Sequence, residues 1–142
     1  MPNDAALLVN PENVFDIARA MKLTIYHNPR CSKSRRTLEI IREHGLEPEV
    51  VHYLDDMPDA AGLLELSGLL GIGIGDLLRE NEAEYREAVD RPPDDEAALA
   101  AWLSRHPKVL ERPIVVDSAS GRAVIGRPPE NVLELIERPA VR

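Results

Sequence analysis

Apolar residues occur in short β-branched runs near the start and the end of the chain, and at helical spacing in its middle. Residues 23–26 and 49–54 are rich in Val, Ile, Thr and Tyr, which predicts two strands. Between them, residues 37–42 carry apolar side chains at helical spacing, and Gly45 predicts the end of that helix. A strand, a helix and a second strand so closely spaced are expected to form a right-handed parallel unit.

The middle of the chain is predicted to be helical. Leucine and alanine recur at helical spacing in residues 59–70, 74–80 and 94–105. Glycine-rich residues 71–73 and proline-rich residues 91–93 separate these segments, because both residue types interrupt helices. We therefore expect three helices in this part of the chain.

Two more strands and a final helix are predicted towards the C-terminus. Residues 113–117 and 122–125 flank a short turn-rich link, which is typical of an antiparallel hairpin, and a helix is expected over 131–137. The predicted order is thus β-α-β, helices, β-β-α. This is an α/β arrangement, a thioredoxin-like core with a mixed sheet, and a helical insertion at about residues 57–112 lies between its two halves.

The length of the chain suits one domain, which we expect to occupy residues 21–142. Residues 1–20 look appended to it. A helix is predicted over Pro11–Ala20, with Asn10 as its N-cap, and Met21 stands directly before the first strand. We expect residues 1–20 to be either a helical N-terminal extension or the product of an upstream start.

Composition narrows the possible environments and partners. Seventeen Lys and Arg residues stand against 25 Asp and Glu, a net charge of -8, and no basic stripe is visible outside the segment around the single cysteine. Binding to nucleic acid is therefore not expected. No secretory signal or membrane-spanning run is apparent, and one cysteine cannot close an internal disulfide. We expect a soluble, cytoplasmic protein, and a monomer.

The single cysteine, Cys31, is the strongest candidate for chemistry. It stands between the first predicted strand and the first predicted helix, where unpaired backbone N–H groups and the helix dipole favour an anionic sulfur. Arg30, Lys33, Arg35 and Arg36 surround it in sequence, and no acidic residue occurs between residues 17 and 38. The sequence therefore predicts a reactive thiolate at Cys31.

Several segments, in order along the chain, resemble one known family. They are Ile25-Tyr26-His27-Asn28-Pro29-x-Cys31-x-x-Ser34-Arg35, Val51-x-Tyr53-Leu54, Leu77-Leu78-Arg79-x-Asn81, Glu111-Arg112-Pro113-Ile114-Val115-Val116 and Ile125-Gly126-Arg127-Pro128-Pro129-Glu130. Over roughly residues 21–137 the chain is similar to the glutaredoxin-coupled arsenate reductases and their relatives. Arg30 and Lys33 depart from the small residues found around the cysteine of members best associated with arsenate. In this respect the chain resembles a subgroup of the family whose physiological substrate is not established.

The resemblance implies roles for several residues. Cys31 is implied as the nucleophile that attacks arsenate or a related oxyanion. Arg79, Arg112 and Arg127 are implied as the three groups that bind the oxyanion. The supporting residues implied around them are His27 and Arg35, Ser34 as a donor to the thiolate, and Pro113 as a cis proline that faces the thiol.

The chemistry of the implied reaction agrees with these residue types. A thiolate can approach an anionic oxyanion only where cations neutralise the oxygens, and arginine does this with paired hydrogen bonds. A second thiol must then supply electrons to the cysteine-arsenic adduct, and a chain with one cysteine has none. Glutathione as co-substrate and glutaredoxin as partner are therefore the implied electron donors.

Two related chemistries fit the spacing poorly. A low-molecular-weight phosphatase loop would have arginine six positions after the cysteine, where this chain has Thr37, and a dithiol pair would need cysteine at Ser34. A non-enzymatic thiol regulator, like the branch of the family that binds RNA polymerase, remains an alternative. A monothiol, glutathione-linked oxidoreductase is another.

No bound metal is expected. The remaining histidines, His44, His52 and His106, show no metal-ligand spacing with one another or with Cys31. Trp102 and the leucines of the insertion are expected to be core residues.

Overall fold

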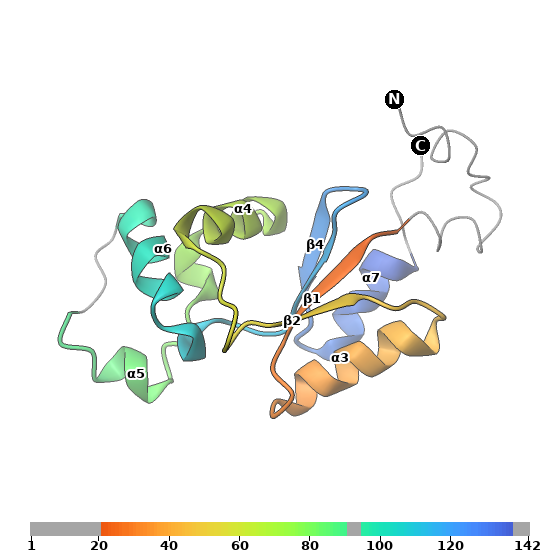
Figure 1. Ribbon diagram of the computed structural model, residues 1–142, viewed down its shortest axis with the longest axis horizontal. Coiled ribbons are helices and arrows are strands. Elements are labelled where there is room, and N and C mark those ends of the chain that lie inside the picture. Colours follow the sequence, from red (N-terminus) through yellow and green to blue (C-terminus); the bar gives the residue numbers. More distant parts are fainter. Residues whose placement is uncertain (1–20, 91–94, 138–142) are drawn as a thin grey trace.

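A computed structural model describes residues 21–90 and 95–137 of the chain (Figure 1). The helix predicted over Pro11–Ala20, and with it the extension of residues 1–20, lies outside the described residues. Within them, a four-stranded sheet and two helices form one half of the molecule, and the helices of the insertion gather in the other half (Figure 1).

The sheet is mixed, as the sequence predicts. Its strands are β1 (Leu23–His27), β2 (Glu49–His52), β3 (Ile114–Asp117) and β4 (Arg122–Ile125), in the spatial order β2-β1-β3-β4. β1 runs parallel to β2 and antiparallel to β3, and β3 pairs antiparallel with β4. The predicted order β-α-β, helices, β-β-α is therefore confirmed, although β2 ends at His52 rather than at residue 54.

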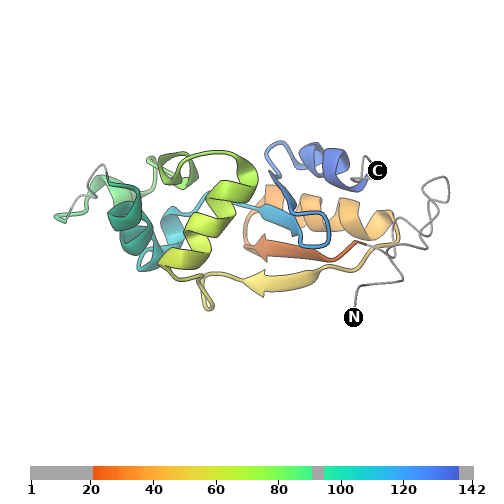
Figure 2. The same ribbon diagram turned by 90° about the horizontal axis from the view of Figure 1, so that it is seen from above.

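Helices α3 (Ser32–Glu43) and α7 (Val132–Ile136) cover one face of the sheet (Figure 2). Their buried apolar residues pack with Ile25 of β1 and Val115 of β3 in one core cluster. Gly45 follows α3 with a φ of 77°, a left-handed conformation that glycine adopts without steric cost, and the helix ends there as predicted. A short 3₁₀ turn, η3 (Pro129–Asn131), leads into α7.

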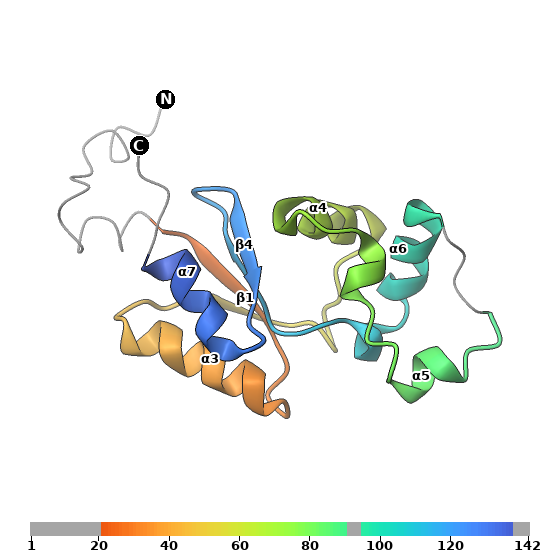
Figure 3. The ribbon, with the colours of Figure 1, turned by 180° about the vertical axis from the view of Figure 1, so that it is seen from behind.

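The insertion packs against part of the opposite face of the sheet and contributes a second core cluster. It contains α4 (Ala60–Leu70), η1 (Ile74–Leu77), α5 (Ala83–Arg86), α6 (Glu96–Ser104) and η2 (Pro107–Val109), and Figure 3 shows its helices from behind. Ile114 and Val116 of β3 belong to this cluster, whereas Val115 belongs to the other. Because side chains alternate across a strand, β3 is buried on both faces and contributes to both core clusters.

Two details of the insertion differ from the sequence-based prediction. The helix predicted over 74–80 is only the 3₁₀ turn η1, after which Leu78 is extended and forms an isolated antiparallel bridge with Leu110. Gly73 and Gly75 weaken helix formation here, and the bridge offers the backbone other partners. The short helix α5 was not predicted. No helix among the described residues has the length and apolar character needed to cross a membrane.

Candidate active site

Cys31 lies at the junction where β1 ends and α3 begins. It is the N-cap residue of α3, with extended backbone angles, and its own N–H donates to the carbonyl of Asn28 at 3.0 Å. The side chain is half-buried and not part of a disulfide. The residue is therefore only partly covered by the rest of the protein, and it stands at the N-terminal end of the helix.

The surroundings of Cys31 favour its thiolate. Burial by itself raises the pKa of the Cys31 thiol, but the backbone N–H groups of Ser34 and Lys33 and the positive guanidinium of Arg112 outweigh it, so the net shift is downward. Hydrogen bonds and positive charge directed at a sulfur stabilise its ionised form. The structure thus gives a physical cause for the reactive thiolate that the sequence predicts.

We expect the rate of Cys31 alkylation by iodoacetamide to follow a single titration with a midpoint below the ~8.5 of an ordinary thiol. The folded protein stabilises the thiolate, so alkylation should be fast near neutral pH and fall as the pH drops through the lowered pKa. The unfolded chain in denaturant is the matched control and should titrate near the ordinary value. A folded-state midpoint at or above that control would contradict this assignment.

An antiparallel contact between two distant segments brings Arg79 beside Arg112. The bridge between Leu78 and Leu110 is extended by hydrogen bonds from the N–H of Arg79 to Val109 O at 2.7 Å and from the N–H of Glu111 to Leu77 O at 2.8 Å. The peptide bond between Arg112 and Pro113 is cis, as the resemblance implies. Two of the three implied oxyanion-binding residues therefore lie on adjacent backbone segments.

Arg127 reaches the same place from the end of β4. Its Nη1 lies 3.9 Å from Cys31 Sγ and donates to the carbonyl of Arg112 at 3.2 Å. Gly126 makes this approach possible, because a Cβ atom there would come within 2.5 Å of Thr37 Oγ1 and 2.9 Å of Pro113 Cγ. Only glycine fits between α3 and the start of β3, and this close packing places Arg127 beside the thiol.

Two carboxylates that the sequence analysis did not single out lie among these arginines. Glu111 Oε1 is 3.1 Å from Arg79 Nη1 and 3.5 Å from Arg127 Nε. Glu82 Oε2 is 3.7 Å from Arg79 Nε and 3.8 Å from Arg112 Nη1. The sequence signals for these carboxylates were only their neighbours: Glu82 follows Arg79 by three residues, and Glu111 directly precedes Arg112.

Ser34 and His27 hold the loop that carries Cys31. The Ser34 hydroxyl is fully buried, accepts the N–H of Asn28 at 3.1 Å and lies 2.6 Å from His27 Nδ1. Among the contacts of the described residues, it is the backbone N–H of Ser34, rather than the hydroxyl expected from the sequence, that stabilises the thiolate. Burial, followed by the charges of His52, Arg42 and Arg35, lowers the pKa of His27, which favours its neutral ring.

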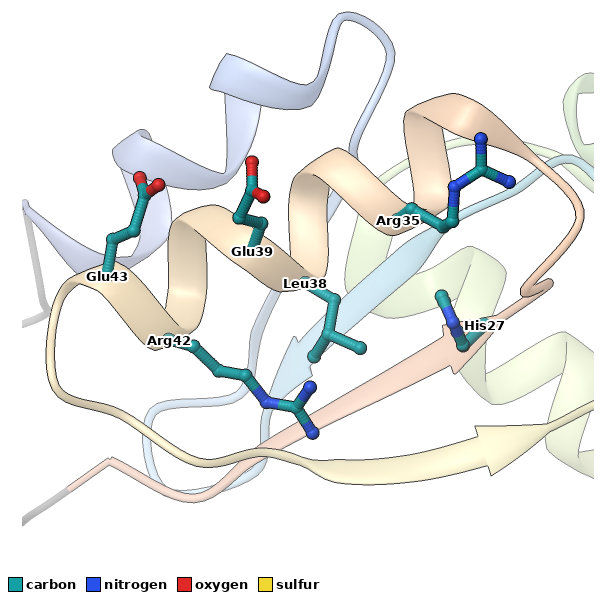
Figure 4. Close-up of a pocket in the computed structure, with 6 residues that line it drawn as sticks. All are labelled: His27, Arg35, Leu38, Glu39, Arg42 and Glu43. Atoms are coloured by element: carbon teal, nitrogen blue, oxygen red, sulfur yellow. The ribbon is translucent and has the colours of Figure 1, made fainter.

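Arg35 supports the same loop from outside, since its Nη1 donates to the carbonyl of Pro29 at 2.9 Å. A shallow hollow beside it runs along α3 and is lined by His27, Arg35, Leu38, Glu39, Arg42 and Glu43 (Figure 4). Cys31 and the three arginines of the cluster do not line this hollow. Within the described part of the chain, no group of three or more His, Cys, Asp or Glu residues is arranged to hold a metal ion.

Comparison with known proteins agrees with the fold and with the motifs. A family model described as the ArsC family matches residues 26–141. The chain is 49% identical over 118 residues to an uncharacterized Escherichia coli protein, YfgD, covering 81% of this chain and 97% of that protein. It is 43% identical over 117 residues to an arsenate reductase of Escherichia coli, covering 80% of each.

A solved structure of an arsenate reductase from Vibrio cholerae has the same fold. Its TM-score with this chain is 0.74, at 42% sequence identity, and the match covers 81% of this chain and 98% of that one. The family match spans more than half of the chain, and it includes the segments that carry Cys31, Arg79, Arg112 and Arg127. The chain belongs to the ArsC family.

Proposed function

We propose that this protein is an oxidoreductase that reduces arsenate, or a related oxyanion, through an adduct at Cys31. The observation that carries the proposal is the clustering of Arg79, Arg112 and Arg127 beside a sulfur whose pKa is lowered. Guanidinium groups are suited to bind tetrahedral oxyanions, because they present several N–H donors in one plane. The names of the arsenate reductases described above support the same substrate.

In the proposed reaction, the Cys31 thiolate attacks arsenic and hydroxide leaves, which forms a sulfur-arsenic(V) bond. The arginines neutralise the oxygens during this approach, since two anions would otherwise repel each other. Reduction to arsenic(III) needs two electrons, and two thiols supply them when they form a disulfide. Because the chain has a single cysteine, we propose that glutathione and glutaredoxin provide these thiols.

The test is a coupled assay that follows NADPH loss with purified protein, arsenate, glutathione, glutaredoxin and glutathione reductase. We expect arsenate-dependent NADPH loss that requires glutaredoxin. Thioredoxin with its own reductase should support little turnover, because no second cysteine in this chain can form the internal disulfide that a dithiol donor would reduce. NADPH loss that is the same with and without arsenate would contradict the proposed activity.

A further inference from the structure

Glu82 and Glu111 are built into the arginine cluster. Glu111 Oε1 accepts from Arg79 Nη1 at 3.1 Å and from the backbone N–H of Arg112 at 3.2 Å, and it also lies 3.5 Å from Arg127 Nε. One carboxylate oxygen therefore contacts donors from all three arginine-bearing segments. An oxyanion bound to the same arginines would need the donors that Glu111 Oε1 now contacts.

The backbone holds both glutamates in place. The N–H of Glu82 donates to the carbonyl of Arg79 at 3.0 Å, at the start of α5, and the N–H of Glu111 donates to Leu77 O at 2.8 Å. The side chains of Glu82 and Glu111 are 29% and 26% exposed, and that of Arg112 is 14% exposed. At this degree of burial, water screens the charges only in part, so each carboxylate changes the potential in the pocket.

The charges in the cluster balance. Three guanidinium groups face two carboxylates and, once Cys31 is ionised, one thiolate, so the charges of these six groups cancel. Without the glutamates the same cluster would be strongly cationic. Such a cluster would bind any tetrahedral oxyanion more tightly, because each uncompensated positive charge adds to the attraction.

We propose that Glu82 and Glu111 are positioning residues that act as internal counter-ions of the oxyanion pocket. They keep the three guanidinium groups in place when no oxyanion is bound, and they lower the affinity of the cluster for oxyanions, which must compete with the carboxylates for the same donors. The inference rests on the proposed function for the location of the oxyanion site. Its test measures binding directly and requires no electron donor.

The experiment compares the parent protein with Glu111→Gln, in which the amide oxygen still accepts hydrogen bonds but the charge is gone. Protection of Cys31 from iodoacetamide is titrated with arsenate and, separately, with sulfate, and each titration yields a Kd. We expect Glu111→Gln to bind both ions roughly tenfold more tightly, equivalent to about 1.4 kcal/mol. Its Cys31 alkylation midpoint should also move to lower pH, since a negative charge near the thiolate has been removed.

Glu82→Gln provides a second variant, which carries the test if Glu111→Gln does not fold. Its effect should have the same sign and be smaller, because its contacts of 3.7 and 3.8 Å are longer. Glu84→Gln is the matched control. It removes the same charge two residues away, where a 41% exposed side chain lies 3.9 Å from Lys108 Nζ, and it should leave both the Kd and the midpoint unchanged.

Unchanged or weaker anion binding in a folded Glu111→Gln or Glu82→Gln variant would overturn the inference, as would a midpoint that moves to higher pH. Those results would indicate that the carboxylates only stabilise the arginines. Absence of protection by either ion in both the parent and the variants would overturn it as well. Failure of the coupled assay alone would count against the proposed reduction and leave these binding results standing.

Discussion

Arsenate-dependent turnover is expected to disappear when Cys31 is replaced by serine. The neighbouring N–H groups and Arg112 favour an anion at this position, but a serine hydroxyl stays protonated near neutral pH and is a far weaker nucleophile than a thiolate. No other cysteine in the chain can take over. We expect the rate in the glutaredoxin-coupled assay to fall by at least roughly 10³-fold.

The fold and the oxyanion pocket should survive this substitution, because serine is close in size to cysteine and the arginines are held by other contacts. Thermal unfolding and circular dichroism of Cys31→Ser are the controls for folding. Turnover within tenfold of the parent, in a preparation free of other reductases, would show that the sulfur of Cys31 is not the nucleophile.

Loss of Arg112 is expected to have the second largest effect, because this residue lowers the pKa of the thiol and is also proposed to bind the oxyanion. Its guanidinium lowers the pKa of the Cys31 thiol, and its side chain is only 14% exposed. Arg112→Ala should therefore raise the pKa of Cys31 and remove one set of oxyanion donors. We expect kcat/KM for arsenate near neutral pH to fall by roughly 10²-fold, and the alkylation midpoint to move to higher pH.

A lysine at the same position separates the two effects. Arg112→Lys keeps the positive charge but loses the planar set of donors, so it should restore much of the lowered pKa of Cys31 and little of the affinity for arsenate. Arg42→Ala is the matched control for loss of an arginine. Arg42 lies near the far end of α3, where it pairs with Glu47 at 2.9 Å, and its effect near the site is a minor contribution to the pKa of His27, so its removal should leave kcat/KM within a few-fold of the parent.

Should Arg112→Ala keep both the parent alkylation midpoint and the parent KM, Arg112 would have no role in either step. A change in the midpoint without a change in KM would limit Arg112 to activation of the thiol. Thermal unfolding and circular dichroism of Arg112→Ala distinguish these outcomes from a general loss of folding, which would also move the alkylation midpoint towards that of the unfolded chain.

The elements that carry Cys31 could be predicted because the signals are local. A β-branched run predicts β1, and a helical pattern with Gly45 predicts the body and the end of α3, although the helix already begins at Ser32, before the apolar pattern of residues 37–42. The segment at 74–80 shows the limit of such signals. Its apolar spacing predicts a helix, but the pairing of Leu78 with Leu110 requires an extended chain, and that partner is remote in sequence.

The arginine cluster could not be derived from residue patterns alone. Arg79, Arg112 and Arg127 look like ordinary surface arginines, and the resemblance to a family was needed to single them out. Nothing in the pattern connects Glu82 and Glu111 to them beyond neighbourhood in sequence. The contacts of Ser34 could not be derived from the sequence either, since its hydroxyl hydrogen-bonds to His27 and Asn28 and its backbone N–H lowers the pKa of the thiol.

By itself, the sequence determined the order of strands and helices and the place of one cysteine at a strand-to-helix junction rich in positive charge. These features depend on neighbouring residues. Tertiary structure alone decided which charges meet at the sulfur, because Arg127 is 96 residues from Cys31 and the bridge between Leu78 and Leu110 joins the other two arginines. It also set two carboxylates among those arginines, since the electrostatics of a pocket depend on distances in space that no local pattern encodes.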